Sequence, residues 1–223
     1  MLKEIMSLWK GERFMKKIIG QFGEMLDADE YLFNHSWEVL TGQAVIDQVE
    51  KDFYDKDSAV NKYEREIRRM LLEHCSLHPR HDISGCLAMM SLVKDAERIG
   101  DYSKNIFEIA VILGGVFKDL KHLERLSLIQ RKIASRFPQL KSAFLESDAN
   151  MAGEILKDYA PIKSECNSML RDSFSEQLST REAVAMALLS RYLKRVNSHM
   201  SNIASGIIYP LDQIDFVRGD ILE

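Results

Sequence analysis

The chain has 223 residues, enough to bury a hydrophobic core as one large domain or as two smaller ones. Apolar residues make up 46% of it, and its 4 prolines and 11 glycines exclude collagen-like, low-complexity and extensively disordered classes. Lys and Arg total 30 against 34 Asp and Glu, so no overall basic field exists and we expect no nucleic-acid partner.

The cysteines and residues 1–17 indicate the cellular compartment. Three cysteines with no framework spacing argue against structural disulfides and favour the cytoplasm. Charges interrupt residues 1–17, so no secretion signal is expected, and no run approaches the roughly 20 apolar residues of a spanning helix. The same residues include a short amphipathic stretch with apolar Leu2, Ile5, Leu8 and Trp9. Such a stretch more often packs on its own bundle, but contact with a partner or with the inner membrane face stays open.

Apolar residues recur every three or four positions along most of the chain, which predicts an all-α fold. Glycine, proline and small polar residues divide it into six helices, at about 12–41, 44–76, 82–113, 118–146, 148–177 and 180–209. Pro138 and Pro161 fall inside two of them and should kink or interrupt those helices. Before the last helix, Ser179 and Glu182 have the spacing of a capping box.

The third and sixth helices repeat each other. A stripe of the coiled-coil type runs along the third helix from Met89 to Leu113, and the first seven of its eight members are matched 97 residues later. The pairs are Met89 and Met186, Leu92 and Leu189, Ala96 and Leu193, Ile99 and Val196, Ser103 and Met200, Ile106 and Ile203, and Ala110 and Ile207. Outside the stripe, Arg98 matches Arg195 and Asn105 matches Asn202. We therefore predict two tandem three-helix bundles related by duplication, over residues 1–115 and 116–223.

A polar row accompanies the stripe on the third helix. Glu97, Asp101 and Asn105 are four residues apart, so they share one helix face. At about 100° per residue that face lies nearly opposite the apolar stripe, and we expect the row to be accessible.

The second helix brings further oxygen side chains to the same level. If it runs antiparallel to the third, equal rise per residue places Asp57 beside Asp101 and Asn61 beside Glu97. Such a cluster suits a cation bound through carboxylates and water, with Asp55 and Glu64 as further candidates. A Glu with an Asp four residues later is also common on solvated helix surfaces, so a plain surface role stays open.

Other chemical motifs are weaker. His74, Cys75, His78 and His81 crowd the turn after the second helix, where two histidines could chelate zinc but ordinary surface histidines fit better. The sequence has no paired Glu-x-x-His motifs, so a ferritin-like di-iron oxidase is poorly supported, and it has no phosphate loop or nucleophile elbow. Buried structural roles are favoured for the cysteines, which include Cys86 and Cys166.

The segment from Glu97 to Ile106 reads E-R-I-G-D-x-x-x-N-I and resembles the signature of the PhoU family of phosphate-uptake regulators. A degenerate second copy, K-R-V-N-S-H-M-S-N-I, runs from Lys194 to Ile203. The turn at 78–82, H-P-R-H-D, is also similar to the family's turn before this helix. The likeness covers most of the chain from about Phe22 onward.

The resemblance implies two three-helix bundles, metal bound at E-x-x-x-D motifs, and no catalysis. It gives Glu97 and Asp101 as metal ligands, while Asp57 and Asn61 rest on the helix register described above. The ion would be divalent or trivalent, such as iron, zinc or magnesium. Lys194 and Ser198 replace the two acidic residues in the second copy, which puts a second metal site in doubt.

The resemblance also implies an adaptor that restrains phosphate uptake and signalling through contact with a membrane phosphate transporter and a sensor histidine kinase. We therefore expect a cytoplasmic, metal-binding regulatory adaptor. Two alternatives remain: an accessory subunit of an ion-coupled phosphate carrier, and a metal-dependent enzyme or metal store that uses the same carboxylates. A homodimer is also compatible with the sequence.

Overall fold

A computed structural model describes residues 13–77, 83–114, 120–175 and 177–214, and these ranges form helices without any strand. The all-α prediction is confirmed. The helices are α2 (Arg13–Leu40), α3 (Ile46–Leu77), α4 (Ile83–Leu113), α5 (Leu120–Ala134), α6 (Phe137–Glu146), α7 (Ala149–Ser175) and α8 (Thr180–Ile208), followed by the short 3₁₀ helix η1 (Leu211–Gln213). The short amphipathic stretch proposed from Leu2 to Trp9 lies outside the described residues.

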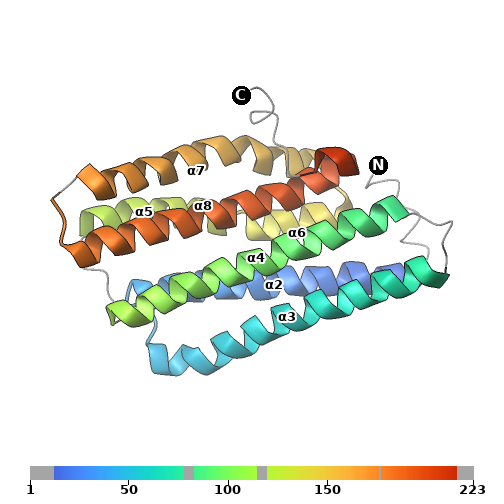
Figure 1. Cartoon of the computed structure of the whole chain (residues 1–223), viewed down its shortest axis with the longest axis horizontal. Coiled ribbons are helices and arrows are strands. Elements are labelled where there is room, and N and C mark those ends of the chain that lie inside the picture. Colours follow the sequence, from blue (N-terminus) through green and yellow to red (C-terminus); the bar gives the residue numbers. More distant parts are fainter. Residues whose placement is uncertain (1–12, 78–82, 115–119, 176, 215–223) are drawn as a thin grey trace.

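The helices form two bundles that lie side by side (Figure 1). Helices α2, α3 and α4 make the first bundle, and α7, α8 and the pair α5 and α6 make the second. The bundles meet where α4 packs against α8 and where α2 packs against α6. The two-bundle prediction is therefore confirmed, whereas the predicted boundary between residues 115 and 116 falls outside the described ranges.

Two prolines behave differently. The prediction of one helix over 118–146 is wrong, because α5 ends at Ala134 and α6 begins at Phe137. Pro138 lies in the first turn of α6, where its missing N–H would have had no helical partner. By contrast, α7 continues through Pro161, so the expected interruption there is absent. Buried Ile155 and Ile162 on either side pack into the bundle and hold the two segments together.

The start of α8 has the predicted cap. The backbone N–H of Glu182 donates to Ser179 Oγ at 3.3 Å, and the backbone N–H of Ser179 donates to Glu182 Oε2 at 3.1 Å. This reciprocal pair satisfies two of the donors that a helix start leaves without partners. At the end of α4, Gly114 has a φ of 73°, a left-handed conformation that favours glycine.

Both predicted apolar stripes are buried. All fourteen paired positions in α4 and α8, from Met89 to Ala110 and from Met186 to Ile207, face the interior. Helix α4 is covered on more than that one side, because it packs against α2, α3 and α8. It is therefore the central helix of the molecule, as Figure 1 shows.

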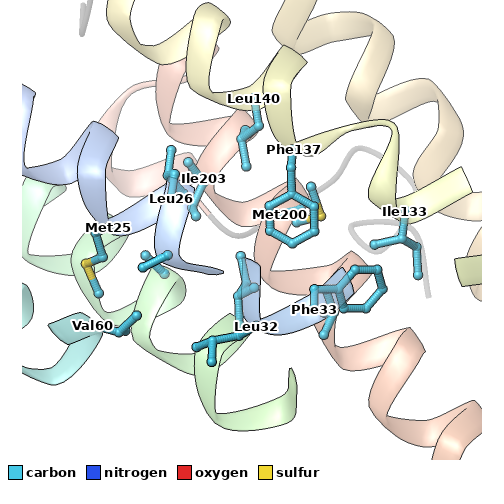
Figure 2. Packing of buried hydrophobic residues seen from close by; sticks show 14 of the residues in the cluster. Met25, Leu26, Leu32, Phe33, Val60, Ile133, Phe137, Leu140, Met200 and Ile203 are labelled. Carbon is cyan, nitrogen blue, oxygen red and sulfur yellow. The ribbon is translucent and has the colours of Figure 1, made fainter. Parts of the chain in front are cut away.

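The hydrophobic core crosses from one bundle to the other. Figure 2 shows Phe33 of α2 beside Phe137 of α6, and their ring centroids are 5.4 Å apart. Met200 and Ile203 of α8 lie in the same region. Helices α4 and α8 also approach closely, because a Cβ at Gly206 would lie 2.6 Å from Cδ2 of Leu92. The two repeats therefore share one continuous core.

Within the described ranges, no helix carries an apolar run of the length and hydropathy that crossing a bilayer demands.

Candidate functional site

The signature segment of α4 lies partly inside the molecule. Ile99 points into the core, while Glu97, expected to be accessible, is only 9% exposed. That expectation is wrong for Glu97, because α3 covers the side of α4 that faces away from the stripe. Asp101 is more open, with 38% of its side chain exposed.

The predicted register between α3 and α4 brings Asp57 to the carboxylates of α4. Asp57 is buried on α3, and its Oδ2 accepts from Nζ of Lys104 on α4 at 3.0 Å. Glu97 Oε2 accepts from Lys94 Nζ at 2.6 Å, and Asp101 Oδ2 accepts from Arg98 Nη1 at 2.9 Å. Each of these three carboxylates therefore faces at least one basic side chain, and Glu97 also lies 3.7 Å from Nε of Arg98.

The remaining candidates of α3 differ in position. Glu64 is buried and lies 3.6 Å from Nζ of Lys94, so it belongs to the same polar region. Asn61 is half-buried and its amide donates to the backbone carbonyl of Asp57 at 3.0 Å. Asp55 is exposed. The structure thus places Asp57 and Glu64 in contact with α4 and Asp55 toward solvent, while the side chain of Asn61 bonds within α3.

A fourth carboxylate in this cluster was not foreseen from the sequence. Asp29 of α2 is 0% exposed, and neither of its oxygens has a hydrogen-bond partner. Burial raises the pKa of Asp29 well above its ordinary value, and the charges of Glu97, Asp101 and Asp57 raise it further. Asp29 therefore joins the other three, and the "carboxylate cluster" below means Asp29, Asp57, Glu97 and Asp101.

Gly100 makes room for Asp29. A Cβ at Gly100 would lie 3.0 Å from Oδ1 of Asp29 and 3.3 Å from Cγ1 of Val60. The glycine within E-R-I-G-D therefore allows the carboxylate of α2 to approach the backbone of α4 between Glu97 and Asp101.

A signal for Asp29 was present in the sequence. The positions three and four residues away on either side are all apolar and all buried, namely Met25, Leu26, Leu32 and Phe33. An aspartate in the middle of such a stripe must be buried with them. A buried carboxylate without a partner is rare enough to indicate a functional site.

Mutual repulsion raises the energy of this cluster. Burial raises the pKa of Asp101, as does Glu97, while Arg98 and Lys94 lower it. Four carboxylates from three helices thus repel one another in a region largely removed from water. A bound cation would relieve that repulsion, and an all-oxygen donor set suits a hard ion.

Asp29 is the member of this cluster whose surroundings would suit a metal ligand. Asp29 offers two buried oxygens that no protein group satisfies, and Gly100 leaves the space they occupy. In the described ranges, no three His, Cys, Asp or Glu side chains are already arranged as a ligand set. Asp57, Glu97 and Asp101 face basic side chains instead. Metal ligation at Glu97, Asp101, Asp57 and Asn61 therefore stays a prediction, to which Asp29 is added.

The matching region of the second repeat differs. Lys194 stands where the first repeat has Glu97, and its Nζ donates to Asn167 Oδ1 of α7 at 2.9 Å. Asn197 matches Gly100, and its amide donates to the backbone carbonyl of Tyr159 at 3.2 Å. Ser198 matches Asp101. The site of the first repeat therefore has no counterpart of like charge here.

A polar network joins the two repeats. Oδ1 of Asp95 on α4 lies 2.7 Å from Nδ1 of His199 and accepts from Nδ2 of Asn202 at 2.9 Å, both on α8. The ring of Tyr102 stacks on that of His199, with centroids 5.7 Å apart. The buried Asp95 thus has partners that the buried Asp29 lacks.

The cysteine and histidine candidates are spread out. Cys86 and Cys166 are buried, as predicted, while Cys75 is half-buried; all three are free thiols. Burial raises the pKa of Cys166 to about 12. His74 is buried in α3, whereas His78 and His81 lie outside the described residues.

Comparison with known proteins agrees with this arrangement. Residues 22–110, which span the first repeat and include the carboxylate cluster, match the family profile of the PhoU domain. The first repeat is therefore a PhoU domain. The sequence resemblance to PhoU proteins is thereby confirmed.

Two curated relatives have the description "Phosphate-specific transport system accessory protein PhoU homolog". The one from Synechocystis sp. is 29% identical over 126 residues, 55% of this chain and 55% of the relative. One from Xylella fastidiosa is 20% identical over 161 residues, 70% of this chain and 68% of the relative. The aligned stretch thus spans about half of the Synechocystis protein.

Two crystal structures of PhoU proteins share the fold. The one from Pseudomonas aeruginosa has a TM-score of 0.76, with 19% identity over 90% of this chain and 97% of that protein. The phosphate transport system regulatory protein PhoU from Streptococcus pneumoniae has a TM-score of 0.71, with the same identity and coverage. The architecture of two bundles is therefore that of PhoU proteins.

Proposed function

We propose that the protein is a metal-binding accessory protein that regulates phosphate transport and phosphate signalling. The observation that carries the metal part is Asp29, a fully buried carboxylate without a hydrogen-bond partner, surrounded by Asp57, Glu97 and Asp101. The PhoU domain of the first repeat and the descriptions of the relatives support the transport part. The role needs no catalytic step.

The carboxylate cluster would hold the ion from three helices of the first bundle. Asp29 would contribute from α2, Asp57 from α3, and Glu97 and Asp101 from α4. The ion would supply positive charge that offsets the repulsion among these groups and joins the three helices. Lys94, Arg98 and Lys104 supply part of that charge without a metal, through their ion pairs with the same carboxylates.

The proposed partners are a membrane phosphate transporter and a sensor histidine kinase. A regulator of this kind would act in the cytoplasm, at the inner face of the membrane. Metal bound to the first bundle would stabilise its three-helix arrangement and with it the surface that meets the partner, by the linkage between ligand binding and stability.

Metal analysis of the purified full chain tests the site. We expect stoichiometric metal in the wild type after growth without chelators, and at least a tenfold weaker affinity in the double variant Asp29→Asn with Glu97→Gln. Asp55→Asn with Glu73→Gln is the control, because it removes two exposed carboxylates of α3. Equal metal content in both variants would show that the carboxylate cluster is not the metal site.

A tagged copy of the chain recovered from membranes tests the regulatory role. Membranes would come from cells grown with ample phosphate and from cells starved of it. We expect a phosphate transporter or its sensor kinase to be retained in amounts that change with phosphate supply. Recovery of the chain without either partner, under both conditions, would contradict the accessory role.

A further inference from the structure

Helices α4 and α8 run antiparallel, so the end of each helix lies beside the start of the other. Gly206, near the end of α8, packs against Leu92 of α4. At the opposite end, Nη2 of Arg181 on α8 donates to the backbone carbonyl of Ile112 on α4 at 3.0 Å. The contact between the repeats therefore has two comparable ends, which lie far apart in Figure 1.

An apolar groove opens where α4 ends and α8 begins. Its volume is about 450 Å³, which lies within the range of about 300–1,000 Å³ for ligand pockets. Ile112 is 76% exposed and Val184 is 53% exposed, and apolar surface gathered in a hollow indicates an interaction site. The "apolar groove" below means Ile109, Ile112, Leu113, Val184, Ala185 and Leu188, together with the polar Thr180 and Arg181.

Arg181 gives the groove a fixed positive charge. Its hydrogen bond to the carbonyl of Ile112 holds the guanidinium beside the groove. Within the described ranges, Arg181 forms no ion pair with a carboxylate. An acidic residue of an occupant could therefore pair with this guanidinium.

The other end of the contact shows what kind of segment packs against these two helices. With the offset of 97 residues, the two sides of the groove match residues 206–210 of α8 and 83–91 of α4. There the chain continues beyond α8 into η1, which packs against α4. Leu211 packs on the core and Ile214 is only 6% exposed. This segment reads Leu-Asp-Gln-Ile, with two apolar side chains three residues apart and an acidic residue between them.

We propose that the apolar groove binds a short amphipathic segment of the protein's membrane partner, with two apolar side chains about one helical turn apart and an acidic residue between them. The proposal rests on the accessory function given above, which requires such a partner. The apolar side chains would leave water in the groove, and the acidic residue would pair with Arg181. The competing occupants are a second copy of the chain and its own residues 115–119, which follow α4 and lie outside the described residues.

Site-specific crosslinking in intact cells identifies the occupant. The photoreactive residue p-benzoylphenylalanine replaces Val184 in the full chain. In the control it replaces Leu128 of α5, which is 49% exposed and lies outside the groove. From position 184 we expect a crosslink to a phosphate transporter or sensor kinase, at a segment with the spacing described, and from position 128 none. A crosslink from position 184 to residues 115–119, to a second copy, or to no membrane protein would overturn the proposal.

Substitutions measure how much the groove contributes to binding. Val184→Asp places a charge among apolar side chains, so we expect the amount of retained transporter or kinase to fall at least tenfold. Leu128→Asp is the matched control and should retain the partner as the wild type does. Both positions are exposed, so the melting temperature should stay near that of the wild type. If Val184→Asp fails to fold, Arg181→Gln replaces it and should lower retention severalfold.

The two proposals fail in different ways. If the wild type retains no membrane partner, the accessory function is wrong, and the groove loses its proposed occupant with it. If the wild type retains the partner and Val184→Asp retains it equally, only the proposal for the groove is wrong. Metal content is measured in the same variants and should be unchanged, because Val184 and Arg181 are not part of the carboxylate cluster.

Discussion

The two repeats agree in their apolar stripes and differ in the polar side next to them. Met89 to Ala110 in α4 and Met186 to Ile207 in α8 are buried in the same pattern, because both third helices must pack inside a bundle. On the polar side, Glu97, Gly100 and Asp101 correspond to Lys194, Asn197 and Ser198. Packing thus constrains the stripe alone, and the polar side is free to acquire a different chemistry.

Gly100 and Asn197 show how one position decides this difference. Gly100 leaves space that the buried carboxylate of Asp29 occupies. Asn197 carries a side chain at the matching position and uses it to bind the backbone of Tyr159. The second repeat therefore fills locally the kind of space that the first repeat keeps for a group from another helix.

Exchanging these two residues should have the largest effect. Gly100→Asn places a side chain against Asp29 and Val60, so we expect metal affinity to fall about ten- to a hundredfold. The reciprocal Asn197→Gly should leave metal affinity unchanged, because no carboxylate cluster is present there. Competition with a fluorescent chelator measures both. Comparable affinity losses in the two variants would contradict the assignment of the site to the first repeat.

Asp29→Asn should remove a pH dependence of stability. The pKa of Asp29 is raised above its unfolded value of about 3.8, so its protonated form favours folding and that stability is lost as pH rises through the raised pKa. In excess chelator we expect Asp29→Asn to be more stable than the wild type above that pKa, by about 1–3 kcal/mol. The pKa of Asp101 is also raised, so Asp101 likewise makes the free energy of unfolding fall as pH rises.

Urea unfolding at a series of pH values from 4 to 8 measures this effect. The control is Asp55→Asn, which removes an exposed carboxylate of α3 and should follow the wild type. If Asp29→Asn and the wild type lose stability in parallel as pH rises, the prediction is wrong. Asp29 would then be ionised in the folded protein, with its charge offset by neighbouring groups. Added metal should reverse the order of stability, because only the wild type retains the full cluster.

Much of this comparison could be predicted from the sequence, because periodicity and the internal repeat depend on spacing alone. Helical geometry predicted the two stripes and the capping box at Ser179. It also predicted that Asp57 faces α4. The exposure of Glu97 could not be read from one helix, because it depends on how closely α3 covers α4. Asp29 was missed because it lies on a third helix, outside the signature, where only its apolar neighbours revealed it.

The helix breaks also depend on tertiary contacts that local sequence does not contain. Pro138 and Pro161 have equal local effects on a helix, yet only the first lies at a break. Pro138 falls in the first turn of α6, where it is well tolerated. Pro161 lies inside α7, where packing on both sides offsets one lost hydrogen bond. Tertiary contacts, which local sequence does not contain, separate the two cases.

The contact between the repeats should be sensitive to a single methyl group. Gly206→Ala would bring a Cβ within 2.6 Å of Leu92, whose side chain must shift, and we expect a loss of about 1 kcal/mol. Gly153→Ala in α7 meets nothing within 4 Å and should stabilise by up to about 1 kcal/mol, through helix propensity. Thermal unfolding compares them. If Gly206→Ala stabilised the protein as much as Gly153→Ala, α4 and α8 would be less closely packed than in the structure.

This close approach of α4 and α8 also matters during synthesis. Leu92 and the rest of that face of α4 leave the ribosome roughly 100 residues before Gly206, a delay of about 5–20 seconds at ordinary elongation rates. During that interval the first repeat has its three helices but an uncovered apolar surface. The nascent first half is therefore a natural client for a chaperone, and a chain that stops before α8 would be prone to aggregate.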